Sequence, residues 1–191
     1  MTVAIYHLRK VSLGLKRKYR VTDEAGNPLC YAEKQLAVAD RIELYQDDSR
    51  QVPLATVQES KAGLMAGLTG YQVIDPAGHQ LGSFRSLPTK SVARTTWEFE
   101  QPGLGAIRGT ERSTRTAVGR RLVGLVNGVA GQFVNAMAKY HLDFERAGEP
   151  MFSIEKPKVL DDWYRLTVHS PELAPIALFA LVITMESRVR G

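Results

Sequence analysis

The stretch YRVTDEAGNPL at residues 19–29 is followed 52 residues later by YQVIDPAGHQL at residues 71–81. Both stretches alternate apolar and polar residues and then reach a turn-forming segment that contains Asp, Ala and Gly. Alternation of this kind is typical of a strand with one buried face, and a glycine supplies the positive φ angle that tight turns need. We therefore predict that each stretch forms a β-hairpin, with Gly26 and Gly78 in the two turns.

A looser third copy, YHLDFERAGEPMFSIEK, occupies residues 140–156 and has its expected turn at residues 146–150. Further segments rich in strand-forming residues are 41–46, 53–60, 91–101 and 105–111. So many short strands, separated by turns and without alternating helices, favour a closed or nearly closed barrel over a parallel α/β sheet. The expected fold is mainly β, in a single domain that spans residues 1–191.

Residues 115–139, RTAVGRRLVGLVNGVAGQFVNAMAK, break the strand pattern. Their apolar residues recur at near-helical spacing, which predicts an additional, peripheral helix from about residue 119 to about residue 139. Two arrangements remain open for this helix. It packs its apolar face on the barrel, or it lies on an anionic bilayer with Arg115, Arg120 and Arg121 beside that face.

The C-terminal stretch SPELAPIALFALVITMESRVRG predicts a second helix at about residues 171–187. Its uniformly apolar part, residues 173–183, would span only about 17 Å as a helix, well short of the roughly 30 Å hydrocarbon core of a bilayer. Glu172 and Glu186 flank this part and oppose a longer span. We therefore expect no transmembrane segment, and instead a helix buried at the centre of the barrel. Its expected core residues are Leu173, Ile176, Leu178, Phe179, Leu181 and Val182.

Composition limits the classes of protein that fit this chain. Of its 191 residues, 44% are hydrophobic, which suffices for a globular core. Cys30 is the only cysteine, so an internal disulfide and a cysteine-based zinc site are both excluded. A single thiol and an N-terminal stretch without signal-peptide features favour a cytoplasmic location, with Cys30 as a small buried side chain.

Catalytic chemistry is not indicated by any motif. The four histidines, His7, His79, His141 and His169, are scattered and show no metal-ligand spacing. The glycine-rich stretch at residues 62–70 lacks the Gly-Lys-Ser/Thr sequence of a phosphate-binding loop. We expect a protein that is not an enzyme and that uses no cofactor.

The net charge of +5 is the most informative functional feature, because it favours anionic partners. One basic cluster comprises Arg9, Lys10, Lys16, Arg17, Lys18 and Arg20, and a second comprises Arg108, Arg112, Arg115, Arg120 and Arg121. The candidate lipid-binding residues among them are Lys16, Arg17, Lys18, Arg112, Arg115, Arg120 and Arg121. Nucleic acid is a less favoured partner, because the aromatic residues alternate as strand-core residues rather than interleaving with the charges. A protein partner stays open.

The same features resemble a known family. The carriers are YRVTDEAGNPLCYAEKQ, then YQVIDPAGHQLGSFRS followed by SVARTTWEFE, then FERAGEPMFSIEK, and last LDDWYRLTVHSPELAPIALFALVITME. In this order, with the apolar helix last, they resemble the tubby C-terminal-like superfamily, especially its phospholipid scramblase and LURP-one-related branch. The resemblance covers nearly the whole chain. It implies a closed antiparallel β-barrel of about twelve strands around a central hydrophobic helix.

Function in that superfamily varies, but lipid recurs in it. Tubby proteins bind phosphoinositides, and scramblases are associated with calcium-dependent lipid movement. No single activity transfers from the resemblance, but together with the basic clusters it favours a domain at the membrane periphery that binds anionic phospholipid or phosphoinositide head groups. At the place of the scramblase calcium-binding stretch this chain has only Asp161 and Asp162, too few oxygens for the six to eight ligands that Ca²⁺ takes. These two residues are a weak calcium candidate, and no metal site is expected.

Overall fold

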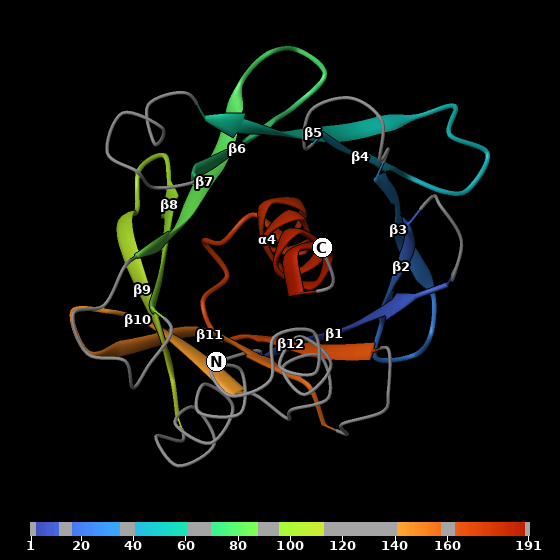
Figure 1. Ribbon diagram of the computed structural model, residues 1–191. Coiled ribbons are helices and arrows are strands. Elements are labelled where there is room, and N and C mark those ends of the chain that lie inside the picture. The colour runs from blue at the N-terminus through green and yellow to red at the C-terminus, as the bar shows by residue number, and fades with distance from the viewer. Residues whose placement is uncertain are drawn as a thin grey trace, which may run out of the picture.

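The computed structural model describes residues 3–11, 17–34, 41–60, 70–87, 96–112, 141–157 and 163–189. These residues form twelve antiparallel strands and, among them, one helix (Figure 1). The elements are β1 (Ala4–Lys10), β2 (Arg17–Asp23), β3 (Pro28–Lys34), β4 (Ile42–Tyr45), β5 (Pro53–Ser60), β6 (Gly70–Ile74), β7 (Gln80–Leu87), β8 (Thr96–Gln101), β9 (Gly105–Glu111), β10 (His141–Arg146), β11 (Glu149–Glu155), β12 (Trp163–Val168) and α4 (Pro175–Val189).

Each strand pairs with the strands before and after it in the chain, and β1 pairs with β12 to close the barrel. The closing register runs from Ala4 opposite Val168 to Arg9 opposite Trp163. Closure leaves none of the twelve described strands with an unpaired edge, which removes the template for edge-to-edge aggregation. The expectation of a mainly β, closed antiparallel barrel is confirmed, and the three expected hairpins are β2–β3, β6–β7 and β10–β11.

The repeated stretch forms the same turn twice. Asp23 accepts a hydrogen bond from the backbone N–H of Asn27 at 2.8 Å, and Asp75 accepts one from His79 at 2.8 Å. The glycines of the two turns have φ angles of 88° and 91°, in the left-handed region that glycine adopts without strain. Hydrogen bonds lower the pKa of both carboxylates. The largest effect on Asp23 comes from the Asn27 side chain, and the largest effect on Asp75 comes from the His79 backbone N–H.

Helix α4 lies inside the barrel and supplies the centre of its core (Figure 1). Its side chains at Leu178, Leu181 and Val182 are 0% exposed, and Phe179 meets the Tyr6 ring edge-on with centroids 5.0 Å apart. Leu173 is also buried, and Ile176 is partly buried against the same core. The expected burial of the C-terminal helix is therefore confirmed.

The start of this helix was predicted wrongly. The expected helix covers residues 171–187, but α4 begins at Pro175 and ends at Val189. The side chain of Gln101 accepts a hydrogen bond from the Ala174 N–H and donates one to the Glu172 carbonyl, each at 2.8 Å. These bonds hold the preceding residues outside the helix. Pro175 then suits the first helical position, where its missing N–H has no intrahelical partner to lose and its φ is already helical.

The two ends of the barrel differ in their connections. Tight turns follow β2, β4, β6, β8 and β10, and the link from β12 to α4 is at the same end. The opposite end, where α4 ends, holds the strand termini that flank the segments outside the described residues. The additional helix expected at residues 119–139 falls in one of those segments and is outside the described residues. Within the described ranges, no helix has both the length and the apolar character needed to cross a bilayer.

Candidate functional site

Strand alternation divides the N-terminal basic cluster between the two faces of the barrel wall. On β2, Tyr19 and Val21 point inward and are 0% exposed. Arg17 has the same parity and reaches α4, whereas Lys18 and Arg20 have the opposite parity and lie on the outer face. One run of sequence thus supplies two separate groups of cations.

The inner group contacts the C-terminal end of α4. Arg17 donates a hydrogen bond from Nη1 to the Ser187 carbonyl oxygen, and Lys34 Nζ is 3.5 Å from the Ser187 hydroxyl oxygen. The last carbonyls of a helix lack intrahelical partners and carry the negative end of the helix dipole. The two cations therefore stabilise the end of α4, and Arg17 has a structural role.

Further buried polar groups surround this helix end. The Tyr164 hydroxyl donates a hydrogen bond to the Glu186 carboxylate, and Lys156 Nζ lies 5.6 Å from the centroid of the Tyr164 ring. Lys156 is 3% exposed and Glu186 is 1% exposed. Buried charges are costly unless their partners are correctly placed, so this layer favours one position of α4 in the barrel.

The outer group of cations lies on the outer face of three neighbouring strands, β12, β1 and β2. Arg9 is directly opposite Arg20 on β2 and directly opposite Trp163 on β12. His7 is opposite Arg165, and its ring meets the Trp163 ring at 62° with centroids 5.4 Å apart. We call these five residues, Arg9, Arg20, Arg165, His7 and Trp163, the outer basic face.

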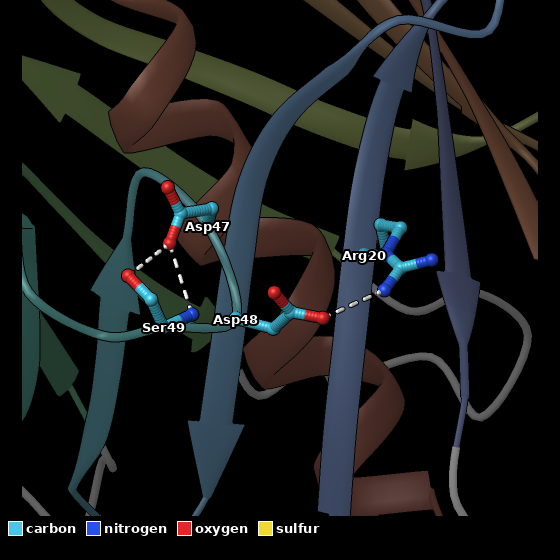
Figure 2. Close-up of polar contacts among 4 residues, drawn as sticks. All are labelled: Arg20, Asp47, Asp48 and Ser49. Atoms are coloured by element: carbon cyan, nitrogen blue, oxygen red, sulfur yellow. Dashed lines mark hydrogen bonds and ion pairs between the residues drawn. The ribbon is translucent and has the colours of Figure 1, made fainter.

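The cations of the outer basic face are exposed and only partly neutralised. Within the described residues, Arg9 and Arg165 have no ion-pair partner. Arg20 pairs with Asp48, with 3.2 Å between Nη2 and Oδ2, and the two side chains are 48% and 68% exposed (Figure 2). Like charges directly opposite each other across a strand pair repel, so an anion over Arg9 and Arg20 relieves a cost already present in the fold. This face is the best candidate for binding an anionic group.

Of the predicted second cluster, only Arg108 and Arg112 are described. Arg112 donates two hydrogen bonds of 2.7 Å to the carboxylate of Asp143, which raise the pKa of Arg112. Arg108 lies 3.8 Å from Glu98, a buried carboxylate that also accepts hydrogen bonds from Arg85. The described arginines of this cluster therefore already have carboxylate partners, unlike Arg9 and Arg165.

The other predicted site residues are only partly placed. Lys18 is on the outer face of β2, opposite Glu33. Outside the described residues lie Lys16, Arg115, Arg120, Arg121, Asp161 and Asp162. Within the described ranges, no group of three or more His, Cys, Asp or Glu side chains is arranged to hold a metal ion.

Sequence reasoning placed Arg9 and Arg20 in a basic cluster but missed Arg165, His7 and Trp163 as their neighbours. Residues 163–165 are more than 140 positions from Arg20, and only the pairing of β1 with β12 brings them together. Parity was the usable local signal, because Arg9 and His7 alternate with the buried Leu8.

Fold and site together define a closed antiparallel barrel filled by its own C-terminal helix, with a basic face on the outside of β12, β1 and β2. No protein-family model matches the chain, and no curated protein matches it.

Proposed function

We propose that this chain is a non-enzymatic domain of the tubby-like or scramblase-related kind, which binds anionic phospholipid or phosphoinositide head groups at the periphery of a membrane in the cytoplasm. The observation that carries the proposal is the opposition of Arg9 and Arg20 on the outer basic face, with Arg165 on the same face. The sequence resemblance to lipid-associated domains supports the same partner.

The magnitude of the attraction fits this proposal. A basic side chain near an anionic membrane surface contributes about 1 kcal/mol. Arg9, Arg20 and Arg165 together would then contribute about 3 kcal/mol, which is a preference of about 100-fold for anionic over neutral lipid. Trp163, partly buried beside Arg9, has the amphipathic ring that suits the interface between water and lipid.

Charge along the sequence supports the same partner. The candidate residues Lys16, Arg112, Arg115, Arg120 and Arg121 belong to a chain with a net charge of +5, which favours anionic partners.

Co-sedimentation with liposomes tests the proposal. Neutral phosphatidylcholine vesicles are compared with vesicles that also contain phosphatidylserine or a phosphoinositide, at low and physiological salt. We expect binding that requires the anionic lipid and weakens with salt. The double substitution Arg9→Ala/Arg165→Ala should lower the affinity about 30-fold, since it removes about 2 kcal/mol.

Arg108→Ala is the matched control, because Arg108 is also an exposed arginine, 73% exposed, but on β9. The change in the free energy of vesicle binding should be less than half of the change that the double substitution causes. An equal effect per arginine would contradict the placement of the site on the outer basic face. If no anionic vesicle is bound at either salt concentration, the lipid proposal is wrong and a protein partner becomes the leading hypothesis.

A further inference from the structure

The guanidinium of Arg20 already binds an oxyanion, the carboxylate of Asp48. Figure 2 shows the two side chains pointing toward one another, with Arg20 on β2 and Asp48 in the connection between β4 and β5. Strand β3 lies between β2 and β4 in the barrel, so this contact crosses the outer surface of β3. Tyr31 and Glu33, whose side chains point outward on β3, are each only 5% exposed, as a covering connection would produce.

The connection that carries Asp48 is held in a defined shape. The side chain of Asp47 accepts a hydrogen bond from the Ser49 N–H at 2.9 Å (Figure 2). The backbone carbonyl of Asp47 accepts a second one from the Arg50 N–H at 3.2 Å. Arg50 has a φ of 60°, in the left-handed region that a non-glycine residue adopts at a cost. Arg50 also reaches Glu33 at 3.4 Å. These contacts fix the residues on both sides of Asp48.

We propose that Arg9 and Arg20 form a subsite for a single phosphate group and that Asp48 is its internal competitor, which a phosphate-bearing ligand must displace from Arg20. The Asp48 carboxylate shows that the Arg20 guanidinium accepts an oxyanion, here from the β3 side. On the β1 side of Arg20, Arg9 lies directly opposite and has no ion-pair partner among the described residues. A phosphate group can accept hydrogen bonds from both guanidinium groups at once, whereas among the described residues Asp48 accepts a side-chain hydrogen bond only from Arg20. This inference rests on the proposed function and adds to it a form of control.

Asp48→Asn tests the competitor in vesicle binding, with vesicles of phosphatidylcholine and phosphatidic acid as the probe. An exposed ion pair of this kind is weak, so we expect the substitution to raise the affinity about twofold to fivefold. Loss of a negative charge would also raise the affinity through the general field of the protein. The same substitution is therefore made in an Arg20→Ala background, where competition for Arg20 is impossible and only the smaller increase due to net charge should remain.

Glu149→Gln is the matched control, because Glu149 is an exposed acid at the start of β11 and its loss changes the net charge equally. It should raise the affinity only through that general field, and by less than Asp48→Asn does. An equal increase from Asp48→Asn with and without Arg20 would overturn the competitor and leave only an effect of net charge. Binding by the wild type with no increase in Asp48→Asn would overturn the competitor while the lipid proposal stands.

Two further outcomes separate the inference from the proposed function. If neither the wild type nor Asp48→Asn binds anionic vesicles, both are wrong. If only Asp48→Asn binds, the competitor is supported and the wild-type domain is a latent lipid binder. Titration of the same variants with inorganic phosphate, followed by tryptophan fluorescence, distinguishes the source of the phosphate. An increase with both probes indicates that the phosphate group suffices, and an increase with vesicles alone indicates that the ligand is a lipid head group.

Discussion

Arg17 and Arg20 lie three residues apart on β2, yet their surroundings are opposite. Arg17 points into the barrel and donates a hydrogen bond to the Ser187 carbonyl at the end of α4. Arg20 points outward, is half exposed, and pairs with the exposed Asp48. The same chemical group therefore serves the fold on one face of the wall and remains available to an external anion on the other. In a barrel filled by its own helix, parity along a strand decides which role a cation has.

The largest effect on stability is expected from a charge placed on the inner side of the barrel wall. Leu178→Asp puts an unpaired carboxylate where the native side chain is 0% exposed, with a cost of several kcal/mol. We expect loss of soluble, cooperatively folded protein, measured by yield and by thermal unfolding in circular dichroism. Gln58→Asp is the control, since Gln58 is exposed on the outer face of β5. A folded Leu178→Asp protein with the wild-type melting temperature would show that α4 does not fill the barrel.

A smaller effect distinguishes the two arginines directly. Arg17→Ala removes a charged donor from the end of α4 and should lower the free energy of unfolding by about 1–3 kcal/mol. Arg20→Ala removes an exposed ion pair and should change it by less than about 0.5 kcal/mol. Urea denaturation measures both. Vesicle binding should show the reverse order, with the loss of affinity in Arg20→Ala.

The contrary pattern is equally informative. If Arg17→Ala lost vesicle binding while its unfolding free energy stayed at the wild-type value, the inner group would be part of the lipid site and the division by parity would be wrong. Arg17→Lys, which keeps the charge, should recover part of the lost stability, because the dipole interaction is retained while the planar fork of donors is not.

Local features of the sequence predict the hairpins, because each one is complete within about a dozen residues. Alternation, the Asp-x-Ala-Gly turn and the resumed alternation all lie between Tyr19 and Ala32 in β2–β3. Parity is also local, and it would have placed Arg17 inside the barrel, since Tyr19 and Val21 share its face. Grouping the cations by distance along the chain instead placed Arg17 with Lys16 and Lys18 as a lipid-binding candidate.

Closure of the barrel and the outer basic face depend on non-local pairing. Nothing within β1 specifies that Arg9 lies beside Trp163, since that pairing depends on ten intervening strands and on the core that α4 supplies. The start of α4 fails for a related reason. Ser170 and Pro171 are good helix-start residues, but two hydrogen bonds from Gln101, at the end of β8, hold that segment out of the helix. A tertiary contact overrides the local preference there.

Cys30 gives the smallest expected effect on the inner side of the barrel wall, because its burial changes how the free energy of unfolding depends on pH. Burial raises the pKa of the Cys30 thiol to about 12 from its ordinary value of 9.0. In the unfolded chain the thiol loses its proton as the pH rises above about 9, while in the native state it keeps it. The native state then binds more protons than the unfolded state, so the stability falls as the pH rises between these two values.

The expected slope is at most about 1.4 kcal/mol per pH unit, the value for one proton. Cys30→Ala lacks this group, so its unfolding free energy should fall less steeply between pH 9 and pH 11 than that of the wild type. Tyrosines and lysines titrate in the same range, but they are common to both proteins and cancel in the difference. The two proteins should have parallel profiles below pH 8, offset by the cost of the smaller side chain. Parallel profiles up to pH 11 would show that the thiol ionises as readily in the folded barrel as in the unfolded chain, and that the wall at β3 admits water.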